Sequence, residues 1–158
     1  MVRAVPLRNC NSTNPFKVGI EMQLDPSAFL ADSDLIQALE RRAIPVVCNE
    51  DRVLFNQGDP AVGLYILSQG EAVLSMDAGD DAVAFSCTAT AGSLLGLPGL
   101  IASQPYSLTA MARKGARVGF ILKDDFQTLI QTELSLMAKV LQVLAAEVRS
   151  ARLAITQR

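Results

Sequence analysis

The chain has 158 residues, of which 50% are hydrophobic and 19% charged, so one globular domain with a real core is expected. Its formal net charge of −2 excludes a global attraction to nucleic acid or to an anionic membrane surface. The sequence contains no histidine, the commonest general base and the commonest zinc ligand, so we expect no metal site.

The cysteines Cys10, Cys48 and Cys87 are far apart and form no CxxC pair. This spacing argues against a disulfide framework or a zinc ribbon, and scattered reduced thiols are typical of a cytoplasmic protein. The N-terminus lacks the apolar core of a signal peptide. An uncharged run over residues 82–112 is interrupted by glycine, proline and many hydroxyl residues, so we expect no membrane contact.

Residues 1–25 are rich in proline and asparagine and are predicted to form an irregular N-terminal arm. The remainder, residues 26–158, is predicted to be the folded domain. Within it, Ser33 is expected to cap a short helix over residues 34–42, which ends before Pro45.

The hydrophobic period then changes from helical to alternating. Short β-prone segments, separated by turn residues, are predicted at 44–48, 52–56, 63–68, 71–76, 82–87, 106–112 and 116–122. Strands of this length and spacing indicate a mainly β fold, either a sandwich, a jelly roll or a small barrel.

Residues 92–110 combine glycine, proline and aliphatic residues without any charge. Ser93 is predicted to cap a helical turn, and Pro98 and Pro105 limit this helix to a turn or two. A ligand at this segment would meet amides, hydroxyls and aliphatic carbon. The alternative is that the segment is buried core.

Two helices are predicted after residue 122, the second from about residue 133 onward. The second helix carries apolar residues at alternating spacings of four and three, which is a heptad seam: Met137, Leu141, Leu144, Val148, Ala151 and Ile155. A second apolar set, Leu136, Val140 and Val143, lies to one side. We expect the second set to cover the β-body and the seam to form a homodimer, the alternative being that both sets pack on the same chain.

Residues 56–74 carry a Gly58-Asp59 turn, an aliphatic strand around Tyr65, then Gly70 and a second strand. This pattern resembles the cyclic nucleotide-binding domain family, and among its members the effector domain of CRP/FNR-type transcription regulators. The resemblance implies an antiparallel double-stranded β-helix (a β-roll or jelly roll) with flanking helices and a long C-terminal dimerisation helix. In those regulators a helix-turn-helix domain follows. This chain carries no recognition helix or basic stripe, so we expect it to make no nucleic acid contact itself.

The resemblance also places a ligand site, whose candidate residues are Gly92, Ser93, Leu94, Leu95, Tyr106 and Ser107. In nucleotide-binding members a glutamate follows the glycine and holds the ribose, and an arginine pairs with the cyclic phosphate. Ser93 stands in place of that glutamate and Tyr106 in place of that arginine. A neutral phenol cannot replace a bidentate charged pair, so the cassette is degenerate and tight cyclic nucleotide binding is not expected.

Three functions fit these features of the sequence to different degrees. The first, which we favour, is a dimeric ligand-sensing domain of a CRP/FNR-like regulator, with a small-molecule effector in the same cleft. The second is a true cyclic AMP or cyclic GMP receptor that regulates a partner protein. The third, a cupin-like enzyme on a similar fold, needs histidine ligands that this chain lacks, so no enzyme and no resident cofactor are expected. Whether Tyr106 lines the cleft or closes it stays open.

Overall fold

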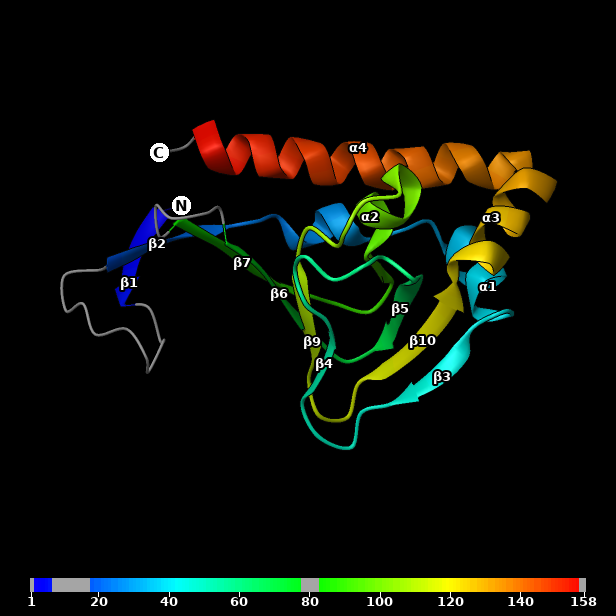
Figure 1. Ribbon diagram of the computed structural model, residues 1–158, viewed down its shortest axis with the longest axis horizontal. Coiled ribbons are helices and arrows are strands. Elements are labelled where there is room, and N and C mark those ends of the chain that lie inside the picture. Colours follow the sequence, from blue (N-terminus) through cyan, green and yellow to red (C-terminus); the bar gives the residue numbers. More distant parts are fainter. Residues whose placement is uncertain (1, 7–17, 78–82, 157–158) are drawn as a thin grey trace.

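The computed structural model describes residues 2–6, 18–77 and 83–156, and shows two β-sheets beneath a long C-terminal helix (Figure 1). The first sheet has the strand order β1 (Val2–Pro6), β2 (Val18–Gln23), β7 (Val83–Ala89), β6 (Ala72–Asp77), β9 (Thr109–Ala112) and β4 (Arg52–Phe55). The second has the order β3 (Ile44–Val47), β10 (Arg117–Leu122), β5 (Gly63–Gln69) and β8 (Ser93–Leu95). The pairings are antiparallel except for β2 with β7, which is parallel.

The helices are η1 (Pro26–Phe29), α1 (Ser33–Glu40), α2 (Leu97–Ala102), α3 (Lys123–Thr132) and α4 (Leu134–Thr156). All seven predicted strands are present, and so are the two helices predicted after residue 122. The predicted fold class, a mainly antiparallel β-roll with flanking helices and a long C-terminal helix, is confirmed.

Two local predictions are wrong. The segment before residue 25 was expected to be irregular, but β1 and β2 pair there and extend the first sheet beside β7. Residues 7–17 of this arm lie outside the described residues, and the boundary between arm and domain stays a prediction. The cap of α1 is Asp32, whose carboxylate accepts the Asp34 N–H at 2.8 Å, so Ser33 is the first residue of the helix.

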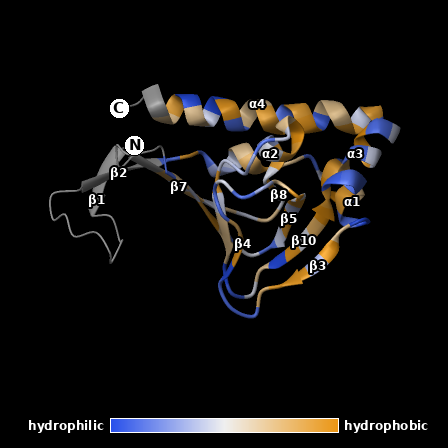
Figure 2. Ribbon diagram, in the orientation of Figure 1, coloured by the Kyte–Doolittle hydropathy of each residue, from blue (hydrophilic) through white to orange (hydrophobic). Residues whose placement is uncertain are grey.

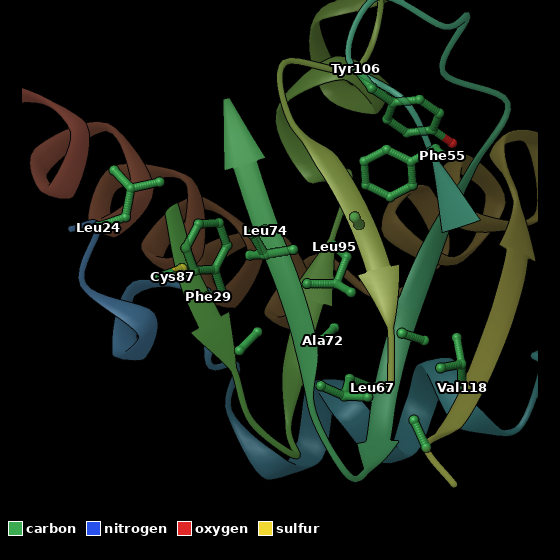
Figure 3. Packing of buried hydrophobic residues seen from close by; sticks show 14 of the residues in the cluster. Leu24, Phe29, Phe55, Leu67, Ala72, Leu74, Cys87, Leu95, Tyr106 and Val118 are labelled. Atoms are coloured by element: carbon green, nitrogen blue, oxygen red, sulfur yellow. The ribbon is translucent and has the colours of Figure 1, made fainter. Parts of the chain in front are cut away.

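The hydrophobic core has two parts. The first lies between the two sheets, where Leu74 and Phe85 from one sheet meet Leu67 and Val118 from the other (Figure 3). The second lies between the four-stranded sheet and the helices and includes Leu39 of α1. Each strand of a sheet with two covered faces points alternate side chains into different layers, which explains why β5 contributes to both parts.

Gly70 turns the chain between β5 and β6, as its place in the sequence predicted, although these two strands belong to different sheets and do not form a hairpin. Its φ of 86° lies in the left-handed region, and a Cβ there would lie 2.8 Å from the Ala116 Cα. A glycine is therefore required where the chain crosses from one sheet to the other.

Helix α4 covers the roll along its whole length and carries apolar residues throughout (Figure 2). Leu136, Val140 and Val143 are buried against the second core, as predicted, and Ala154 reaches the first. The helix is also held by polar contacts at both ends. Lys139 Nζ donates to Asp32 at 2.7 Å, and Ser150 Oγ accepts the Asp25 N–H at 2.8 Å.

Candidate functional site

Gly92 and Ser93 sit in a tight turn that leads into β8. Gly92 has a φ of 95°, and its N–H donates to the Leu67 carbonyl at 2.8 Å. Ser93 is fully buried and belongs to a strand, so the prediction that it caps a helix is wrong. Helix α2 instead begins after Gly96, which has no side chain with which to cap it. The Ser93 hydroxyl has no hydrogen-bond partner within the described part of the chain.

Leu94 and Leu95 are buried on opposite sides of β8. Leu94 contributes to the core beneath the helices, and Leu95 to the core between the sheets. Both side chains therefore hold the β-roll together. Neither lines the cavity described below.

Tyr106 is buried in the core between the two sheets. Its side chain is 3% exposed, and its ring stacks on Phe55 with the ring centroids 4.0 Å apart (Figure 3). Its hydroxyl donates to the Gly63 carbonyl at 2.6 Å and accepts the Gly63 N–H at 3.2 Å. The ring lies directly over Gly96, where a Cβ would come within 2.7 Å of Tyr106 Cε1. Tyr106 is thus part of the core between the two sheets, and it does not line the cavity described below.

The Gly58-Asp59 turn is hydrogen-bonded to the backbone of Tyr106. The Tyr106 N–H donates to the Asp59 carbonyl at 2.9 Å, and the Gly58 N–H donates to the Tyr106 carbonyl at 2.8 Å. The Asp59 carboxylate in turn accepts the Asn56 N–H at 3.0 Å. These bonds fix the loop that precedes β9. The next residue, Ser107, is exposed.

A cavity of about 170 Å³ lies where this loop, α2, η1 and β6 meet α4. Its lining is Leu24, Phe29, Met76, Pro98, Ser107, Leu108, Glu147, Val148 and Ala151. Of the six predicted ligand residues only Ser107 belongs to it. The cavity is lined almost entirely by carbon, and none of the residues that line it is a lysine or an arginine.

Glu147 is the only ionisable residue in that lining. It is 8% exposed, and neither carboxylate oxygen has a hydrogen-bond partner among the described residues. Burial raises the pKa of Glu147 from 4.5 to about 8, because an isolated charge is poorly solvated there. Sequence reasoning missed this residue, although the buried set Leu136, Val140 and Val143 continues to position 147 with the same spacing.

Cys87 of β7 lies close enough to Glu147 to respond to its charge. Burial, followed by the carboxylates of Asp25 and Glu147, raises the pKa of the Cys87 thiol to about 12. A thiol that stays protonated at neutral pH is a poor nucleophile and a poor metal ligand. Cys48 is also free and buried. Across residues 2–6, 18–77 and 83–156 no cluster of histidine, cysteine and acidic residues is suited to a metal ion.

The predicted dimer seam is partly exposed. Leu141 is 54% and Val148 51% exposed, and Met137, Leu144 and Ala151 are half-buried. The side chain of Ile155 lies outside the described part. Val148 and Ala151 also line the cavity, so these two residues belong both to the seam and to the cavity. Within the described chain, no helix combines the length and apolar character needed to cross a membrane.

The sequence matches a known protein family. The family model for the cyclic nucleotide-binding domain matches residues 45–133, which is more than half of the sequence. The chain therefore belongs to the cyclic nucleotide-binding domain family. Comparison with curated protein sequences gives no significant match.

Solved structures with the same fold include regulators from bacteria and a eukaryotic kinase subunit. The catabolite activator protein of Thermus thermophilus is 21% identical with a TM-score of 0.65, and the match covers 84% of this chain and 62% of that one. The c-di-GMP-responsive global regulator CLP of Xanthomonas campestris is 23% identical with a TM-score of 0.63, over 80% and 62% of the two chains. The chain thus spans about 62% of the length of these two proteins.

The regulatory domain of Toxoplasma gondii PKA, crystallised with cAMP, is 19% identical with a TM-score of 0.56, over 68% of this chain and 42% of that one. At such identities these likenesses show a shared fold. They leave the ligand of this chain to be argued from its own residues.

Proposed function

We propose that this chain is the dimeric, non-enzymatic sensing domain of a regulator similar to the CRP/FNR type, with a phosphate-binding cassette that has lost its function. The observation that carries the proposal is the position of Tyr106. The resemblance sets Tyr106 in place of the phosphate-binding arginine, and its ring is buried against Phe55 while its hydroxyl is bonded to Gly63. A cyclic phosphate in the cavity would find no cation among the residues that line it.

The proposal includes a homodimer formed through the seam on α4. Apolar residues with heptad spacing, of which Leu141 and Val148 are more than half exposed here, are the usual signature of a helix that packs against a partner. Because the seam shares Val148 and Ala151 with the cavity, a bound effector would touch the helix on which the two protomers meet. Ligand binding would then bias the angle between the two helices. The proposal also includes a cytoplasmic location and no nucleic acid contact by this chain itself.

Two measurements test the proposal. Isothermal titration calorimetry with cyclic AMP and with cyclic GMP should give no binding tighter than the micromolar range, since loss of the charged pair costs roughly ten- to hundredfold in affinity. Size-exclusion chromatography with light scattering should give twice the monomer mass at micromolar protein. A submicromolar constant for either nucleotide, or a strict monomer, would contradict the corresponding part.

The second candidate is a true cyclic nucleotide receptor that acts on a partner protein. It is favoured by membership of the cyclic nucleotide-binding domain family and by the fold shared with the PKA regulatory domain. The same calorimetry separates it from the first, because only this candidate requires tight binding of a cyclic nucleotide.

A further inference from the structure

Glu147 is a buried carboxyl group for which the fold offers no partner. Glu147 belongs to the lining of the cavity beneath α4, and both of its oxygens are buried and unbonded within the described part of the chain. Buried polar groups in folded proteins are nearly always hydrogen-bonded, and an unpaired one calls for an explanation. A group of the ligand that donates hydrogen bonds would supply the missing partner.

The other residues that line the cavity indicate the chemistry of the rest of such a ligand. Leu24, Phe29, Met76, Pro98 and Leu108 present carbon to it, and the Ser107 hydroxyl is the other polar side chain in the lining. A dry apolar cavity of about 150 Å³ is large enough for benzene. The volume here, about 170 Å³, therefore suits a single ring or a short branched chain.

The charge of the site selects against an anion. The described residues that line the cavity include no lysine or arginine, and the Cys87 thiol, which responds to the charges of Asp25 and Glu147, brings no positive charge either. An anionic ligand would face a carboxyl group without compensation. A protonated amine would meet a hydrogen-bond acceptor that becomes its counter-ion.

We propose that the cavity between α4 and the β-roll binds a small apolar amine, with the ammonium group held by Glu147 and the hydrocarbon body packed against Phe29 and Leu108. This inference rests on the proposed function, since it names the ligand class of the effector cleft. On binding, the ammonium arrives already protonated and the Glu147 carboxyl gives its proton to the buffer. The burial that raises the pKa of Glu147 to about 8 means that this proton is present before binding at neutral pH.

The test uses benzylamine as the probe, with benzyl alcohol and benzoate as matched neutral and anionic compounds. Calorimetry at pH 7 should show benzylamine binding about tenfold or more tightly than benzyl alcohol, because a charge-assisted bond replaces a neutral one. Repeating the benzylamine titration in phosphate and in Tris should give heats that differ by the release of nearly one proton per site. Benzyl alcohol should release none.

Glu147→Gln keeps the size of the side chain and removes the proton, so it should abolish both the preference for benzylamine and the proton release. Arg149→Gln is the control, because Arg149 lies on the same helix but lines a different cavity. It should leave both unchanged. Should Glu147→Gln prove poorly folded, the comparison of the three probes and the two buffers on the unaltered protein still decides the matter.

Three results would overturn the inference: no binding of benzylamine at millimolar concentration, equal binding of benzylamine and benzyl alcohol, or preferred binding of benzoate. A protein that is a dimer and ignores benzylamine would keep the proposed function and lose only this ligand class. Tight binding of cyclic AMP would contradict the lost cassette as well.

Discussion

Tyr106 is part of the core and is fixed there by its ring and by its hydroxyl. Removing its hydroxyl leaves the Gly63 N–H and carbonyl without that partner in a buried setting. Tyr106→Phe is expected to lower the free energy of unfolding by about 1–3 kcal/mol, measured by urea denaturation. Tyr65→Phe is the control, because the Tyr65 hydroxyl makes one half-buried bond, to the Leu54 carbonyl, and its loss should cost less. A smaller effect at Tyr106 than at Tyr65 would contradict this role.

Glu147 makes stability depend on pH in an unusual direction. Between pH 4.5 and about 8 the folded state holds this proton and the unfolded state does not, so the free energy of unfolding falls as pH rises through that range. The loss is expected to be on the order of a few kcal/mol, and below pH 4.5 this group contributes nothing further. Thermal or urea unfolding of the wild type and of Glu147→Gln from pH 5 to pH 8 measures it. A variant with the same pH slope as the wild type would be the contrary result.

At the scale of elements, α4 has two apolar stripes that differ in burial. With about 3.6 residues per turn, the buried stripe through Val140 and Val143 lies beside the exposed stripe through Leu141 and Val148. The first stripe is buried against the β-roll. In the second stripe, Leu141 and Val148 are more than half exposed, and exposed apolar side chains of this kind are typical of an interaction surface. Met137 and Leu144 of the same stripe are partly buried against the second core.

Leu141→Asp should therefore convert the expected dimer into a monomer, since it places a charge in the middle of the seam. Because Leu141 is 54% exposed, the fold itself should lose little stability. Gln142→Asp adds the same charge one residue along, on an exposed position that points away from the seam, and should remain dimeric. Light scattering at micromolar protein measures both. A Leu141→Asp protein with the mass of the wild type would show that the seam is not the interface.

At the scale of the whole molecule, the sequence predicted the roll well because its signals are local. Each strand from Ile44 onward is bounded by turn residues and carries β-prone side chains, and those properties need no knowledge of the partner strand. The two strands before residue 25 were missed, since β2 is stabilised by a parallel pairing with β7 that lies more than sixty residues further on. Strand β8 has only three residues, and the glycine before it was interpreted as the start of a helix.

The site was harder to predict than the fold for a related reason. The resemblance predicts where the cassette lies, but the direction in which Tyr106 points depends on Phe55 and Gly63, which are distant in the sequence. Glu147 was missed because a glutamate on a long helix usually faces water. Only the position of α4 over the roll buries it.

The reach of α4 over both parts of the core also bears on how the protein is made. The Asp25 amide bonds to the Ser150 hydroxyl, and Val140 and Ala154 cover different parts of the core. A nascent chain on the ribosome would carry an open roll with exposed apolar surface for as long as α4 is still inside the exit tunnel. We therefore expect the roll to complete its folding only after α4 has emerged, and until then its exposed apolar surface can bind chaperones.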